Sequence, residues 1–134
     1  MKLAASYSDK VLDHYANPRN VGAFDRTDCC IGTAVVGLRV HRDLLKLQIK
    51  VNDRGVIEDA CFKAYGSGPM IAVGSLTSDW IKGKPLIAAQ ALTSQEIAEA
   101  LALPLIKIHC SVLAESAVKA AISDYTNKQL ADAS

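Results

Sequence analysis

The chain has 134 residues, of which half are hydrophobic and 22% are charged, a composition typical of one globular domain that buries about two thirds of its unfolded surface. A net charge of +1 without a cluster of Lys and Arg argues against nucleic acid as a partner, and no apolar run reaches the roughly 18 residues of a membrane span. The start of the chain lacks the apolar core of a secretory signal, so we expect a cytoplasmic protein whose four cysteines stay reduced.

The first half of the chain predicts one short helix and then strands. Ser8 can cap a helix that Pro18 ends, and residues 22–34 have few periodic apolar positions, which indicates a loop. Alternating apolar and polar residues are typical of half-buried strands, and residues 52–55 predict a hairpin turn. Three strands are expected, over residues 35–40, 45–51 and 56–65.

The second half of the chain predicts helices. They are expected over residues 70–81, from the capping box of Thr93 and Glu96 to about Leu101, and over residues 111–128. Strands followed by helices predict an α+β fold, here a small three-stranded antiparallel sheet with helices packed on one face. Because there are no internal repeats and no linker, we expect a single domain over residues 1–134 with a core of about residues 7–128.

Several segments carry a resemblance to a known family. They are Tyr7-Ser8-Asp9-Lys10-Val11, His14-Tyr15, Asn17-Pro18-Arg19-Asn20-Val21-Gly22 and Lys46-Leu47-Gln48-Ile49-Lys50-Val51-Asn52-Asp53. From about Tyr7 to Lys128 the chain closely resembles the IscU family of iron–sulfur cluster assembly scaffolds, which also forms the N-terminal module of NifU. The resemblance implies an IscU/SufE-like fold and a role in iron–sulfur cluster assembly.

The resemblance also implies where metal ligands should lie. In the family, the cluster ligands come from a Cys-x-Asp segment, a Gly-Cys-Gly loop and a His-Cys pair at the start of the last long helix. The matching positions here hold His41 and Asp43, then Ser67, then His109 and Cys110. Two of the three cysteines are therefore replaced, one by His41 and one by Ser67.

These replacements change the expected metal chemistry. Iron–sulfur clusters are held mainly by thiolates, and a serine hydroxyl is a poor ligand for soft metals, whereas imidazole binds iron and zinc well. We therefore expect one Zn²⁺ or Fe²⁺ ion held by His41, Asp43, His109 and Cys110, and a [2Fe–2S] cluster only weakly or with added ligands. The alternative for His41 is a solvated side chain on a polar strand edge.

Cys110 is the candidate persulfide acceptor. The resemblance implies docking of a cysteine desulfurase. The N-terminal end of a helix lowers the pKa of a thiol, and a sulfur acceptor needs an exposed, low-pKa cysteine, so we expect sulfur transfer to Cys110. A buried, inert Cys110 is the alternative. Adjacent cysteines rarely bind one metal together and an isolated strand cysteine usually serves packing, so Cys29, Cys30 and Cys61 are weaker candidates for substitute ligands.

Three functions stay open at this point. The first is a scaffold-family protein that docks a desulfurase and binds a metal but holds clusters poorly, and the second is a regulatory paralogue that binds partners without building a cluster. The third is a zinc-stabilised structural protein with unrelated partners. No hydrolase triad or phosphate-binding loop is present in the sequence, so we do not expect an enzyme.

One further segment concerns partners. The family's chaperone-binding segment corresponds here to Leu103-Pro104-Leu105-Ile106-Lys107, in which one proline of the family pattern is replaced. An extended apolar peptide is retained, so a DnaK-type chaperone is a candidate partner. We expect a monomer or a weak homo-oligomer.

Overall fold

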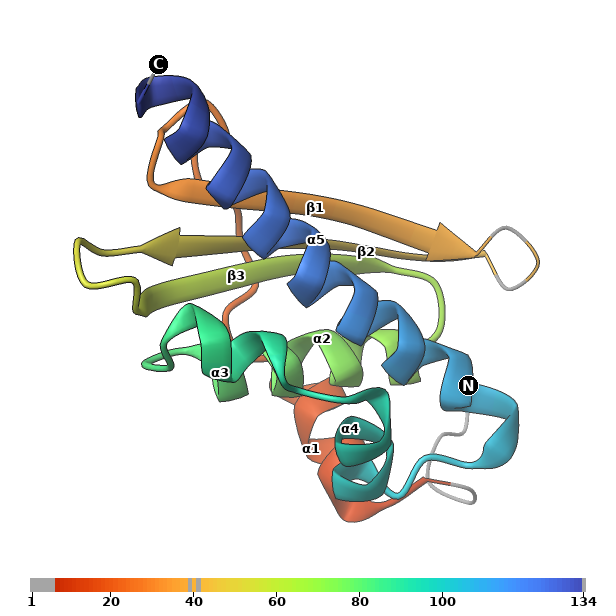
Figure 1. The fold of residues 1–134 in the computed structure, drawn as a ribbon. Helices are drawn as coiled ribbons and strands as arrows, with labels where there is room; N and C mark the ends of the chain where they lie inside the picture. The colour runs from red at the N-terminus through yellow and green to blue at the C-terminus, as the bar shows by residue number, and fades with distance from the viewer. Residues whose placement is uncertain (1–6, 39, 41, 134) are drawn as a thin grey trace.

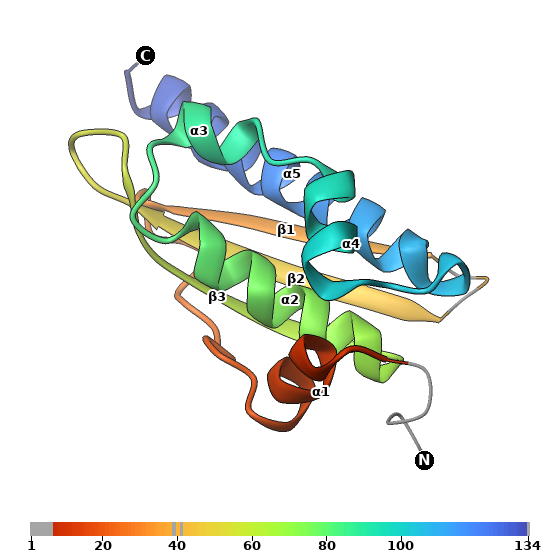
Figure 2. The same ribbon diagram turned by 90° about the horizontal axis from the view of Figure 1, so that it is seen from below.

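The computed structural model describes residues 7–38, 40 and 42–133. In this part of the chain a three-stranded antiparallel sheet, in the order β1-β2-β3, is covered on one face by helices (Figures 1 and 2). The expected α+β fold is thereby confirmed. The elements in chain order are α1 (Asp9–Ala16), β1 (Ile31–Leu38), β2 (Asp43–Val51), β3 (Ile57–Tyr65), α2 (Gly68–Ile81), α3 (Leu86–Gln90), α4 (Ser94–Leu101), the 3₁₀ helix η1 (Leu105–Lys107) and α5 (Ile108–Ala133).

Local sequence signals explain the starts of the short helices. The Oγ atom of Ser8 accepts a hydrogen bond from the N–H of Val11, so Ser8 caps α1 as predicted. The same hydroxyl donates to the carbonyl of Leu101 at 2.6 Å, which ties the start of α1 to the end of α4. The capping box of Thr93 and Glu96 is present at the start of α4.

The hydrophobic core lies between the sheet and helices α2 and α5. Leu45, Leu47 and Ile49 of β2 are fully buried, as their alternation with polar residues predicts. A Cβ atom at Gly32 would overlap the backbone carbonyl of Ala121, so glycine is what allows α5 to cross β1 closely. The apolar stripe of α5 is buried against the sheet through Ala114, Ala117, Val118, Ala121 and Ile122.

Several elements differ from the sequence prediction. Strand β1 begins at Ile31, inside the predicted loop, because pairing with β2 orders residues such as Gly32 that lack a strand-like pattern. The short helix α3 was not predicted. Helix α5 begins at Ile108 rather than at residue 111, so His109 and Cys110 lie within its first turn. In the described part of the chain, every helix is too short or too polar to span a bilayer.

Candidate metal centre

Three side chains that are distant in the sequence meet between the start of β2 and the start of α5. The Nε2 atom of His109 lies 2.6 Å from Oδ2 of Asp43, and the Sγ atom of Cys110 lies 3.8 Å from the same oxygen and 3.5 Å from Nε2 of His109. Their donor atoms all lie within 4.8 Å of one another. The structure therefore brings together three of the four predicted ligands, and the fourth, His41, lies outside the described residues.

The loop between β3 and α2 fixes the carboxylate of Asp43. The backbone N–H of Ser67, the N-cap residue of α2, donates to Oδ1 of Asp43 at 2.9 Å, and the Ser67 hydroxyl lies 3.3 Å from the same oxygen. One oxygen of Asp43 is therefore held by Ser67, while the other faces His109 and Cys110. Ser67 thus orients a ligand, a role that the sequence prediction missed.

The backbone conformation and the close surroundings of Gly66, the residue before Ser67, require a glycine. Its φ angle is +129°, a conformation that L side chains rarely adopt, and a Cβ atom there would collide with Oδ1 of Asp43. The Gly-Ser-Gly-Pro segment predicted a break between the strand and the helix. It did not predict that the carboxylate of Asp43 packs against this break.

Asp43 is ionised despite its burial. Burial alone would raise the pKa of its carboxyl group, but the N–H of Ser67 and the ring of His109 stabilise the carboxylate, so the pKa lies below its usual value. A buried carboxylate beside an imidazole and a thiol has the charge and the donor types to hold a divalent cation.

Cys110 differs from the sequence prediction. Its side chain is fully buried, and burial together with the negative charge of Asp43 raises the pKa of the thiol to about 12, although Ser67 and Lys107 act in the opposite direction. The expectation of an exposed, low-pKa thiol was therefore wrong for this conformation. The effect of a helix N-terminus is smaller than the effects of burial and a neighbouring carboxylate.

The donor set fits one tetrahedral ion rather than a cluster held by this chain alone. Zinc and ferrous iron accept thiolate, imidazole and carboxylate ligands, and three protein ligands leave a fourth position open. A [2Fe–2S] cluster needs mainly thiolates, and Cys110 is the only cysteine in this group of donors. The residues that meet here can thus bind a metal ion next to a single thiol.

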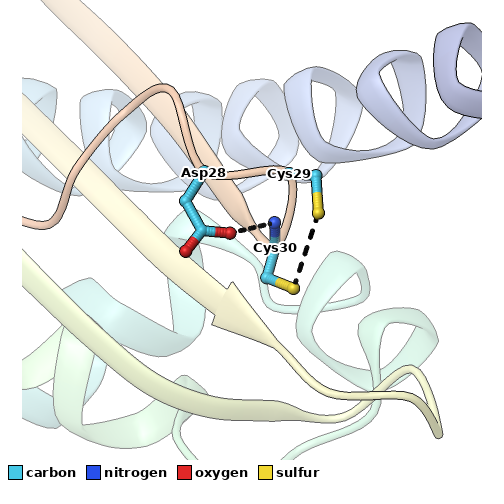
Figure 3. Close-up of side chains that lie close together, drawn as sticks. All are labelled: Asp28, Cys29 and Cys30. Carbon is cyan, nitrogen blue, oxygen red and sulfur yellow. Dashed lines mark hydrogen bonds between the residues drawn. The ribbon is translucent and has the colours of Figure 1, made fainter.

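The other cysteines lie away from this centre. Cys61 is buried on β3, where burial and then the charge of Asp59 raise the pKa of its thiol to about 11, so it behaves as a packing residue. Cys29 and Cys30 form a second group of possible metal donors together with Asp28, in the turn before β1 (Figure 3). The Cys30 thiol has a raised pKa because of its contact with Cys29.

The segment proposed from the sequence as a chaperone site is exposed. Leu105 and Ile106 in η1 are 92% and 75% exposed. Beside them lies an apolar groove of about 510 Å³ whose walls come from α4, η1 and the start of α5. No sequence pattern indicates the groove, because the residues that form it come from three elements and a connecting segment: Ser94, Gln95, Ala98, Glu99, Ala102, Leu103, Leu105 and Ile108.

Known proteins of similar sequence and structure were found. The family model described as the NifU-like N terminal domain matches residues 6–132. The iron-sulfur cluster assembly scaffold protein IscU of Escherichia coli K12 is 58% identical over 124 residues, which cover 92% of this chain and 97% of that protein. The protein of the same name from Haemophilus influenzae is 56% identical over 124 residues, 92% of this chain and 98% of its own. The crystal structure of the N-terminal part of a nitrogen-fixing NifU-like protein from Brucella abortus has a TM-score of 0.67 at 16% identity, covering 90% of this chain and 94% of that chain, and so supports the fold.

Proposed function

The chain belongs to the NifU-like N-terminal domain family, and from this premise we propose that it serves iron–sulfur cluster assembly as a scaffold-type protein that holds a metal ion next to one sulfur-accepting thiol. The observation that carries the proposal is the meeting of Asp43, His109 and Cys110 within 4.8 Å. Such a protein binds and passes on iron and sulfur rather than catalysing a reaction of its own, and we propose that it does so in the cytoplasm.

The metal ion is Fe²⁺ or Zn²⁺. Asp43 supplies charge, His109 an imidazole nitrogen and Cys110 a thiolate, with His41 as the proposed fourth ligand. Binding of the cation releases the thiol proton of Cys110 to solvent, because the thiolate is the ligand form. A cation also offsets the carboxylate charge that raises the pKa of that thiol.

Sulfur arrives from a cysteine desulfurase. In this step the Cys110 thiolate attacks the outer sulfur of the persulfide on the enzyme, and the enzyme's cysteine leaves as a thiolate. Because Cys110 is fully buried, the first turn of α5 has to move before the transfer. We therefore propose that docking of the desulfurase opens this turn.

Cluster holding is weak in this chain. Ser67 lies next to Asp43, where its hydroxyl replaces a thiolate that a [2Fe–2S] cluster would need. We propose that the protein alone forms a cluster poorly and that added ligands, from a partner or a second chain, complete it.

One observation favours a second candidate function. The burial and raised pKa of Cys110 suit a protein that binds the desulfurase without accepting sulfur, which would make it a regulatory paralogue. In either case the exposed Leu103–Lys107 segment and its groove are the proposed contact for a DnaK-type chaperone.

The two candidates make different predictions for one experiment. The purified chain is incubated anaerobically with cysteine, a cysteine desulfurase and Fe²⁺, and binding, persulfide on Cys110 and cluster absorbance are measured. Binding with persulfide on Cys110 and weak cluster absorbance supports the scaffold-type function. Binding without persulfide supports the regulatory function, and no binding at micromolar concentrations contradicts both.

A further inference from the structure

The turn before β1 carries a second group of metal donors, at the other end of α5 from the candidate metal centre. A carboxylate oxygen of Asp28 and the Sγ atoms of Cys29 and Cys30 lie within 4.8 Å of one another (Figure 3). This turn contacts α5 at Lys128, roughly 28 Å along the helix axis from His109 at 1.5 Å per residue. We propose that Asp28, Cys29 and Cys30 bind one divalent ion of the zinc and cadmium class, independently of the centre at Asp43.

The spacing of the two sulfur atoms fits such an ion. Adjacent residues of an extended strand point to opposite sides, but residues 29 and 30 lie in a turn that brings their Sγ atoms to 3.9 Å. Two thiolates bound to one tetrahedral zinc at about 2.3 Å each are roughly 3.8 Å apart. The sulfur atoms therefore already have the separation that the ion requires.

The third donor narrows the choice of metal. Oδ1 of Asp28 accepts a hydrogen bond from the N–H of Cys30 at 2.8 Å. This hydrogen bond orients the carboxylate toward the same ion that the Cys30 thiol would bind. Two thiolates disfavour calcium and magnesium, which take oxygen ligands, and a carboxylate is a weaker partner for Cu⁺. The mixed set suits a borderline-soft d¹⁰ divalent ion with a water as its fourth ligand.

The backbone of the turn is held from two sides. The carbonyl of Asp28 accepts hydrogen bonds from the N–H of Ile31 and from the ammonium group of Lys128. The carbonyl of Cys29 accepts from Nε2 of Gln129 at 2.7 Å. The carbonyl of Cys30 accepts from the N–H of Val51 at 2.9 Å. Because three successive carbonyls are fixed, little conformational entropy is lost when an ion binds.

The site is open to solvent, unlike Cys110. Cys29 is exposed and Cys30 is half-buried. A polar hollow of about 320 Å³ borders Cys30, with Asn52, Asp53 and Glu58 among its lining residues, and it has room for the bound water. Binding of M²⁺ here releases two thiol protons to solvent and needs no oxidant or reductant.

Cadmium alone is the probe that tests the site, because cadmium–thiolate bonds absorb in the ultraviolet. The full chain is titrated with Cd²⁺ under a non-thiol reductant, and bound metal per chain is measured by equilibrium dialysis. Cys29→Ser with Cys30→Ser should remove one equivalent of tightly bound Cd²⁺ and the absorbance of two thiolate bonds. Cys61→Ser, at a buried cysteine outside both donor groups, is the matched control and should change neither quantity.

A second variant tests the carboxylate and avoids any change in the thiols. Asp28→Asn keeps an oxygen that can accept the Cys30 N–H, and it should lower the Cd²⁺ affinity by roughly tenfold or more with two sulfur ligands retained. Unchanged stoichiometry in the double cysteine variant would overturn the proposal. So would half an ion per chain at this site, which indicates a metal shared between two copies, or an unchanged affinity for Asp28→Asn.

Discussion

Asp43 and His109 make a close polar contact in the candidate centre, 2.6 Å between Oδ2 and Nε2. The two residues are 66 positions apart in the sequence, and the contact joins the first residue of β2 to the first turn of α5. Since Ser67 already holds the other oxygen of Asp43, the carboxylate has one fixed orientation toward the helix. An incoming cation would bind between groups that are preorganised for it.

Asp43→Asn should weaken zinc binding by at least about tenfold, because the substitution removes the negative charge and leaves two of the three donors. Competition with a chromophoric zinc chelator measures the affinity, in chains that also carry Cys29→Ser and Cys30→Ser so that only the centre at Asp43 is followed. Asp59→Asn is the control, since Asp59 pairs with Lys82 outside the donor groups, and it should bind zinc as the unmodified chain does. Equal affinities in the two variants would show that zinc binds elsewhere.

His41→Cys combined with Ser67→Cys should restore a stable [2Fe–2S] cluster. The pair raises the number of cysteines at the family's ligand positions from one to three around Asp43, and thiolates are the ligands that such a cluster requires. Visible absorbance and iron content after anaerobic reconstitution measure the result. A stoichiometric cluster in the unmodified chain would contradict the ligand assignment, because Cys29, Cys30, Cys61 or a second chain would then have to contribute.

Sequence patterns predicted the sheet and the main helices, and the family resemblance led us to expect that Asp43, His109 and Cys110 lie together, as the structure places them. Alternation in β2 and the capping signals of Ser8 and Thr93 are local, so they are readable without the fold. The state of the Cys110 thiol was predicted wrongly because its pKa depends on what packs around it in three dimensions. The separation of the Cys29 and Cys30 sulfurs depends on a turn that the chain forms only against α5 and β2.

Gly66→Ala should disturb the centre without unfolding the protein. An added methyl group would collide with Oδ1 of Asp43 in a backbone conformation that alanine rarely adopts, so the carboxylate has to move away from the Ser67 N–H. We expect weaker zinc binding and a loss of roughly 1–3 kcal/mol in the free energy of unfolding. Gly22→Ala is the control, because a Cβ atom there meets nothing within 4 Å. Intact zinc affinity in Gly66→Ala would argue against this role of the glycine.

His14 should make the protein less stable as the pH falls. Burial, with the nearby charge of Arg19, lowers the pKa of His14 in the folded state, and its Nδ1 lies 2.7 Å from the Ser75 hydroxyl. The unfolded chain therefore binds more protons below about pH 6.5, and stability is lost as the pH drops through that value. Urea unfolding at several pH values should show a smaller change of stability with pH for His14→Gln. Asp25→Asn is the control and should keep the pH dependence of the unmodified chain, because the carboxylate of Asp25 titrates at lower pH.

Thr77→Val should stabilise the protein by about 1 kcal/mol. The Oγ1 atom of Thr77 is buried in α2 without a hydrogen-bond partner among the described residues, and valine has the same shape without the polar atom. Thr93→Val provides the opposite case, since it removes the capping box of α4 and should destabilise by about 1 kcal/mol. The denaturant concentration at the unfolding midpoint measures both changes, provided that the dependence of the unfolding free energy on denaturant concentration stays constant. A loss of stability in Thr77→Val would indicate a hydrogen bond in solution.

The burial of Cys110 has a kinetic consequence. Its side chain belongs to the same packed cluster as Leu45, Met70 and Leu113. The packed core therefore blocks access of reagents to the thiol. Any reagent that reacts with Cys110 has to wait for a minor open state, and each 1.4 kcal/mol of opening free energy reduces the population of that state about tenfold. At high reagent concentration the reaction rate should therefore reach a plateau at the opening rate of α5, so the timing of chemistry at this cysteine is set by helix motion and not by collision.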